Sequence, residues 1–146
     1  VLSNFAARVL NGCPPLIYED GLQKRDFISV YDVAAACRLG IETEAANGRA
    51  FNISSGEAAT VKDVAARTIR ALGSRTLEPE ITGKYRTGDI RHCFADITRA
   101  RDVLGWRPRV TLEQGLEDLA GWLEGQTTPD RIIQARTELT ARGLML

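Results

Sequence analysis

Residues 85–106, YRTGDIRHCFADITRARDVLGW, constrain the fold most strongly because a charged loop is followed there by a sharply delimited helical pattern. The carboxylate of Asp96 can accept hydrogen bonds from the free amide groups of a first helical turn, so Asp96 is the expected N-cap. Gly105 stands where a left-handed residue commonly ends a helix, and Pro108 prevents the helix from continuing. The sequence therefore predicts a short helix between Asp96 and Gly105.

Two arginines and one aspartate, Arg86, Arg91 and Asp89, lie in the loop before this helix. Guanidinium groups bind phosphate oxygens through parallel, charge-assisted hydrogen bonds, so the loop is a candidate site for a phosphorylated ligand. The alternative is a solvated loop whose charges pair with one another, which contributes at most about 1 kcal/mol per pair. Taken alone, the charge pattern favours the solvated loop.

Composition indicates an ordinary globular domain and excludes several classes of partner. The 146 residues are 44% hydrophobic and 26% charged, which is enough for one domain with its own core. Lysine plus arginine equals aspartate plus glutamate, 19 each, so no basic field is present to attract nucleic acid. No apolar run approaches membrane-spanning length. We therefore expect neither a nucleic-acid partner nor a membrane partner.

The cysteines and the single histidine favour neither a metal site nor a disulfide framework. Cys13, Cys37 and Cys93 are odd in number and far apart, and only His92 could complete a zinc site. Reduced thiols are typical of the cytoplasm, which is the expected location. Cys37 lies on an apolar stripe of an expected helix, so it is predicted to be a core residue.

Periodicity and turn signals predict an α/β chain that is rich in helix and has several very short strands. Helices are expected over residues 3–11, 33–42, 61–72, 97–104, 112–125 and 129–142. Strands are expected over residues 16–18, 26–30, 50–54, 77–81 and 93–95. Asp32 and Thr60 are expected N-caps, and Thr111 with Gln114 forms the pattern of a capping box. Trp106 and Trp122 are expected to pack in the core or between helices.

Two separate segments carry a resemblance to a known family. The arginine, any residue, glycine, aspartate pattern of residues 86–89, followed by the helix that closes on Leu-Gly-Trp at 104–106, is one of them. The other is EDGLQKRDFISVYDVAAA at residues 19–36. Both resemble signatures of the extended short-chain dehydrogenase/reductases, the NAD-dependent nucleotide-sugar epimerases and dehydratases. The resemblance extends from about residue 5 to about residue 123.

The resemblance implies roles for three arginines and one aspartate. Arg25 and Arg86 resemble the two arginines that contact the diphosphate of the substrate, although Arg25 could instead form a surface ion pair with Asp26 or Glu19. Asp89 is expected either to accept a hydrogen bond from a ribose or sugar hydroxyl or to orient one of the neighbouring arginines. Arg91 is expected either to support the diphosphate or to pair with Asp96.

The resemblance also implies a place for the nucleobase. Ile17 and Tyr18 match the short strand beside the base, where backbone groups would read the base edge and side chains would pack on it. The alternative is an ordinary core strand, which is the preferred interpretation for Ile17.

The family's cofactor and catalytic signatures are absent from this chain. It contains no GxGxxG or GxxGxxG turn, and no tyrosine is followed four residues later by lysine. We therefore expect no catalytic residue and no NAD contact here, and the chain resembles the C-terminal portion of such an enzyme. Residues 1–125 are expected to bind substrate and to complete part of a Rossmann sheet, while residues 126–146 form a helical extension.

The implied function is positional. In a complete enzyme of this family, NAD transiently oxidises the sugar at C4, and this portion would hold a UDP- or dTDP-sugar beside it. The expected partners are the nucleotide sugar, an N-terminal Rossmann half and, in some members, a second subunit as a homodimer. The chain alone should be inactive. The alternatives are an inactive paralogue, or an interaction module whose last helix docks a partner through exposed Leu144, Met145 and Leu146.

Overall fold

The computed structural model describes residues 1–126 and 129–145, and over these residues the chain is α/β, as predicted. The helices are α1 (Leu2–Leu10), α2 (Val30–Glu42), the 3₁₀ helix η1 (Glu44–Ala46), α3 (Val61–Ala71), α4 (Thr98–Leu104), α5 (Leu112–Leu123) and α6 (Ile132–Ala141). The strands are β1 (Leu16–Ile17), β2 (Lys24–Asp26), β3 (Ala58–Thr60), β4 (Glu80–Ile81) and β5 (His92–Cys93). None of the described helices is both long and apolar enough to cross a membrane.

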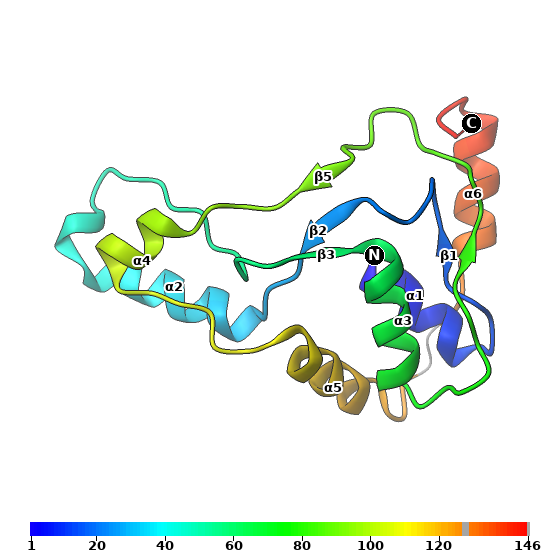
Figure 1. Ribbon diagram of the computed structural model, residues 1–146, viewed down its shortest axis with the longest axis horizontal. Coiled ribbons are helices and arrows are strands. Elements are labelled where there is room, and N and C mark those ends of the chain that lie inside the picture. Colours follow the sequence, from blue (N-terminus) through cyan, green and yellow to red (C-terminus); the bar gives the residue numbers. More distant parts are fainter. Residues whose placement is uncertain (127–128, 146) are drawn as a thin grey trace.

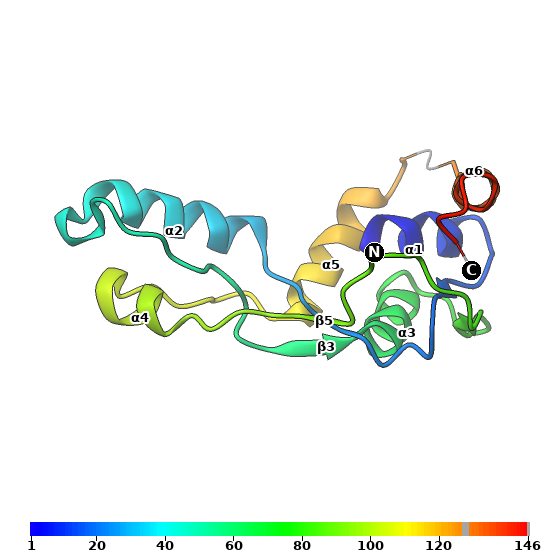
Figure 2. The ribbon, with the colours of Figure 1, turned by 90° about the horizontal axis from the view of Figure 1, so that it is seen from above.

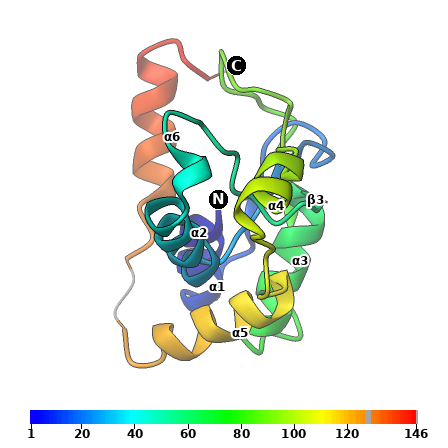
Figure 3. The same cartoon turned by 90° about the vertical axis from the view of Figure 1, so that its left-hand side faces the viewer.

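The molecule is elongated, with helices gathered at both ends (Figure 1). Helices α2 and α4 lie side by side at one end, which faces the viewer in Figure 3. At the other end α1 packs against α3, which also packs against α5. Extended segments that include β2, β3 and β5 run between the two ends (Figure 2). The chain therefore passes repeatedly from one helical group to the other.

Two small sheets position the loop that holds most of the candidate residues. Strands β1 and β4 pair in parallel, with Leu16 opposite Glu80. Strand β2 is the centre of a second sheet, antiparallel to β3 and parallel to β5. The loop between β4 and β5, residues 82–91, therefore connects the two sheets, and we call it the arginine loop.

Three of the predicted helix ends are confirmed, those at Thr60, Thr111 and Gly105. The side chain of Thr60 accepts a hydrogen bond from the N–H of Asp63 at 3.1 Å, and Thr111 and Gln114 form the full capping box. Helix α4 ends at Gly105, which has the left-handed φ of 64°. Its N-cap is Ile97 rather than the predicted Asp96, so the helix begins one residue later than expected. The Asp96 carboxylate accepts a hydrogen bond from the first helical N–H, that of Thr98, at 2.8 Å.

The predicted strand over residues 50–54 is wrong, because no described strand occupies that segment and β3 follows it instead. Asp26 at the end of β2 accounts for the difference. Its carboxylate accepts hydrogen bonds from the N–H and the hydroxyl of Ser55, at 2.8 and 2.7 Å, and from the hydroxyl of Ser54. These contacts hold the two serines in a turn before the chain pairs with β2.

Helix α2 buries a different face from the predicted one. Cys37 is exposed rather than in the core, and Ile41 is exposed as well. Ser29, not Asp32, is the N-cap, and Asp32 is buried instead. The Asp32 carboxylate accepts hydrogen bonds from the backbone N–H groups of residues 109 and 110, both at 3.0 Å. These bonds turn the helix so that Asp32 and Ala36 face inward.

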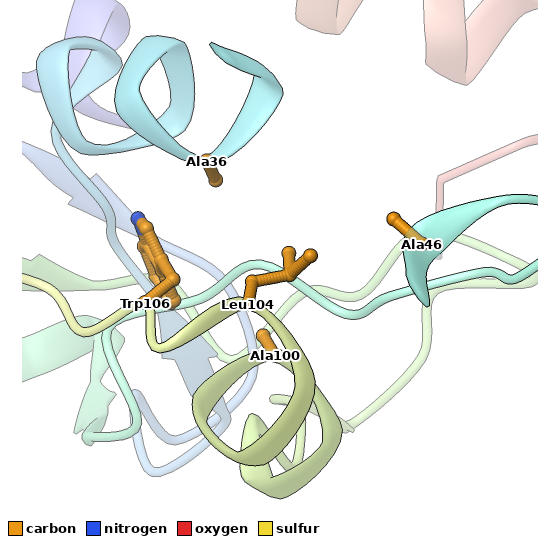
Figure 4. Close-up of a cluster of buried hydrophobic side chains, with 5 residues drawn as sticks. All are labelled: Ala36, Ala46, Ala100, Leu104 and Trp106. Atoms are coloured by element: carbon orange, nitrogen blue, oxygen red, sulfur yellow. The ribbon is translucent and has the colours of Figure 1, made fainter. Parts of the chain in front are cut away.

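Trp106 is confirmed as a core residue. It lies between α2 and α4 with its indole nitrogen toward α2 (Figure 4), and its Nε1–H donates to the backbone oxygen of Asp32 at 3.0 Å. The buried members of this cluster are Ala36, Ala46, Ala100, Leu104 and Trp106. The prediction for Trp122 is wrong, because this side chain is 67% exposed on α5. A second cluster of Phe5, Ile17, Val61 and Ala65 joins α1, β1 and α3.

Candidate functional site

The arginine loop has an irregular backbone that is hydrogen-bonded to the segment just after β1. Gly83 and Gly88 have φ values of 67° and 86°, a conformation that side chains with a Cβ rarely adopt. The N–H of Glu19, just after β1, donates to the carbonyl oxygen of Lys84 at 2.7 Å. The two glycines therefore shape the loop, and this bond holds it beside the end of β1.

Three of the predicted site residues come together around Arg86. Its Nε and Nη2 donate to one carboxylate oxygen of Asp89, at 2.9 and 2.8 Å. Its guanidinium carbon lies 5.6 Å from the centre of the Tyr18 ring, within the range of a cation–π interaction. The Arg86 side chain is nevertheless 45% exposed. The arrangement is a guanidinium that is oriented on two sides and still accessible to a ligand.

The side chain of Arg25 contacts the backbone of the arginine loop. Its Nη1 donates to the carbonyl oxygens of Lys24 and Arg91, both at 2.8 Å, and its Nη2 donates to that of Ile90 at 2.5 Å. The carboxylates considered as alternative partners are engaged elsewhere, Asp26 with the two serines and Glu19 with Arg91. In the structure Arg25 therefore holds the end of the arginine loop.

Arg91 is paired with two carboxylates from the turn after β1. Its Nη1 lies 2.7 Å from a carboxylate oxygen of Glu19, and its Nη2 lies 2.7 Å from one of Asp20. The hydrogen bond from Arg91 lowers the pKa of Asp20, and Asp20 in turn raises the pKa of Arg91. The pair with Asp96 considered from the sequence is thus replaced by contacts that link the arginine loop to β1.

The two candidates on the β1 segment differ in exposure. Ile17 is fully buried in the second core cluster, and its backbone oxygen accepts from the N–H and the hydroxyl of Thr82, at 2.8 and 3.0 Å. Tyr18 is half-buried beside Arg86. Gln23, to which the sequence pattern gives no role, is buried and donates to the backbone oxygen of Tyr18 at 2.8 Å. This bond fixes the backbone of Tyr18, and no local sequence pattern indicates it.

Comparison with known proteins gives a family and several relatives. The family model described as GDP-mannose 4,6 dehydratase matches residues 1–119. The dTDP-L-rhamnose 4-epimerase of Burkholderia thailandensis is 36% identical over 107 residues, which are 73% of this chain and 29% of that protein. These relatives act on nucleotide sugars, as their names state.

Solved structures give the same result. UDP-glucose 4-epimerase of Thermotoga maritima, solved with UDP-glucose, has a TM-score of 0.76 and 31% identity over 85% of this chain and 39% of its own. The dTDP-glucose 4,6-dehydratase of Bacillus anthracis, solved with NAD, has a TM-score of 0.71 and 25% identity over 86% of this chain and 39% of its own.

In the solved structures the matched region is the C-terminal part. The chain spans between about a quarter and two fifths of the length of these proteins. The family match covers most of the chain, and both segments that suggested the resemblance lie within it. The chain therefore belongs to the GDP-mannose 4,6 dehydratase family, among the NAD-dependent epimerases and dehydratases of the extended short-chain dehydrogenase/reductases.

Proposed function

We propose that this chain is the nucleotide-sugar-binding portion of an NAD-dependent epimerase or dehydratase, and that Arg86 binds the diphosphate. The observation that carries the proposal is the accessible Arg86 guanidinium, which is oriented by Asp89 and lies beside Tyr18. The relatives supply the class of ligand, since one was solved with UDP-glucose and another is named for a dTDP sugar. The Arg86 guanidinium would supply positive charge to the diphosphate of such a ligand.

The geometry of the guanidinium suits a diphosphate. Arginine has five N–H donors in a planar fork. Asp89 engages the edge formed by Nε and Nη2, which leaves the end formed by Nη1 and Nη2 directed to a second acceptor. Asp89 would keep this orientation in the complex, and its other oxygen would be available to a ribose or sugar hydroxyl.

The site would be completed by Arg25, Arg91 and the β1 segment, which contact the arginine loop. Arg25 is proposed as the second diphosphate arginine, since the three carbonyl bonds that it makes use three of its five donors. Arg91, held by two carboxylates, would fix the loop rather than neutralise the ligand. Tyr18 would pack on the nucleoside, with Ile17 behind it in the core.

No residue of this chain is assigned to NAD or to the chemical step. NAD supplies hydride transfer at the sugar C4 in enzymes of this kind, and the sequence lacks the glycine-rich turn and the tyrosine–lysine pair that would hold and use it. The contribution of residues 1–125 would be to fix the sugar within reach of an N-terminal half. The two-residue strands β1 and β4 are too short to form an independent sheet, which supports their joining a larger one.

The burial of Met145 weakens the alternative that this chain is an interaction module. It required Leu144, Met145 and Leu146 to be exposed together, but Met145 is only 5% exposed. Leu144 is exposed, and Leu146 lies outside the described residues. The apolar end that would dock a partner is therefore partly used within the chain.

Replacing Arg86 with alanine is expected to weaken UDP binding about 30-fold, because a charge-assisted contact contributes roughly 2 kcal/mol. The measurement is isothermal titration calorimetry with UDP and with dTDP, on the complete reading frame that encodes this chain. Arg38→Ala is the matched control, since Arg38 is an exposed arginine on α2 that pairs with Glu42. Equal affinity of wild type and Arg86→Ala, or an equal loss in both variants, would contradict the proposal.

A further inference from the structure

The C-terminal tail, residues 143–145, pairs with the backbone of the arginine loop. After α6 the chain turns at Gly143, whose φ is 67°, and the N–H of Leu144 donates to Leu139 at 2.9 Å. The carbonyl oxygen of Leu144 then accepts a hydrogen bond from the N–H of Thr87 at 3.1 Å. Arg86 and Met145 form an antiparallel β-bridge. Figure 1 shows the C-terminus next to this loop, at the end of the molecule where α6 lies.

The tail is attached to a helix that is itself fixed. Just before α6, Asp130 forms an ion pair with Arg8 of α1 at 2.8 Å, and the two side chains are only 15% and 9% exposed. Ile132, the first residue of α6, is buried as well. At the other end Met145 is 5% exposed. The segment from Asp130 to Met145 is therefore buried against the rest of the molecule at both ends. This holds the tail in a defined place relative to α1 and Arg86.

We propose that the C-terminal tail is a positioning element for Arg86, which holds the arginine loop in the conformation that binds the ligand. The inference rests on the proposed function of Arg86. The loop contains two glycines in left-handed conformations, so its backbone has access to many alternatives when nothing restrains it. Hydrogen bonds from a fixed neighbouring segment reduce that freedom before the ligand arrives, which strengthens binding by preorganisation.

The contacts favour positioning over inhibition. The tail pairs with the main chain of Arg86 and Thr87, whereas the Arg86 side chain extends toward Tyr18 and Asp89. The Arg86 side chain remains 45% exposed with the tail in place. The family match ends at residue 119, so α6 and the tail lie outside the shared region. The device would therefore be an addition to the family's binding loop rather than part of it.

The test measures loop order and ligand affinity on the same variants. Deletion of residues 143–146 removes the pairing, and Met145→Asp places a charge in the buried position. Hydrogen–deuterium exchange of residues 84–90 without ligand should become at least roughly tenfold faster in both variants, since the Thr87 amide loses its acceptor. Affinity for UDP should fall roughly tenfold in both.

Two further variants serve as controls. Ile133→Ser alters an exposed position on α6 and should change neither quantity. Met145→Leu keeps an apolar side chain of similar size and should retain the slow exchange and full affinity of the wild type. Wild-type behaviour of the leucine variant, beside a loss in the aspartate variant, would show that the buried apolar contact is responsible rather than any change at this position.

Each outcome decides the inference. Faster loop exchange together with weaker UDP binding supports it. Unchanged exchange, or faster exchange with unchanged or tighter UDP binding, overturns it. If the wild-type protein binds neither UDP nor dTDP, the proposed function fails and the ligand-positioning role fails with it. The exchange data would in that case still show whether the tail orders the loop, so the two failures are distinguishable.

Discussion

Replacing Trp106 with alanine is expected to lower the free energy of unfolding by about 3–5 kcal/mol, the range found for large aromatic residues in cores. The indole is only 2% exposed and joins α2 to the end of α4. Three of the other buried residues in its cluster are alanines, Ala36, Ala46 and Ala100. Such short side chains cannot move into the space left behind, so the cavity should persist. The Nε1–H bond to Asp32 is lost as well.

Chemical denaturation followed by circular dichroism measures this effect without relying on tryptophan fluorescence. Trp106→Phe should cost less than alanine, because the ring still fills most of the space while the hydrogen bond is missing. Trp122→Ala is the matched control, and we expect a change within about 0.5 kcal/mol because this side chain is largely exposed. Similar losses for the two alanine variants would show that the assigned core is wrong.

Replacing Arg8 with methionine is expected to destabilise the protein by about 3 kcal/mol, as breaking a buried ion pair does. Arg8 pairs with Asp130 and also donates from Nε to the carbonyl oxygen of Pro14 at 2.6 Å. Methionine preserves much of the apolar contact but leaves the largely buried Asp130 carboxylate without its cation. Part of the loss should appear as faster hydrogen exchange in α6, which this pair anchors to α1.

A double-mutant cycle separates the energy of the Arg8–Asp130 ion pair from the other contacts of the two side chains. Arg8→Met combined with Asp130→Asn should be clearly less destabilised than the sum of the two single variants, because the second change removes the unpaired charge. Strict additivity, or a loss below about 0.5 kcal/mol for Arg8→Met, would show that the pair does not fix α6.

Signals confined to a few neighbouring residues could be predicted from the sequence. The capping box at Thr111 and Gln114, the cap at Thr60 and the helix end at Gly105 depend on side chains three residues apart or on a single backbone conformation. The α/β class followed from the same local patterns. The two family segments likewise needed only the order of residues along the chain.

Contacts between distant segments could not be predicted. The inward face of α2 is set by Asp32 binding the amide groups of residues 109 and 110, more than seventy positions away. Arg25 was expected to contact a ligand, and its hydrogen bonds to carbonyl groups of the arginine loop were not foreseen. In each case a polar group finds its partner only after folding, and hydrophobic periodicity contains no information about that choice.

A crystal structure of the protein with UDP would show where the ligand binds. We predict that diphosphate oxygens lie within about 3 Å of the Arg86 guanidinium nitrogens, with the nucleoside against Tyr18. Asp89 should still orient Arg86 in that complex. UDP bound away from the arginine loop, with Arg86 contacting only Asp89 and Tyr18, would contradict the account.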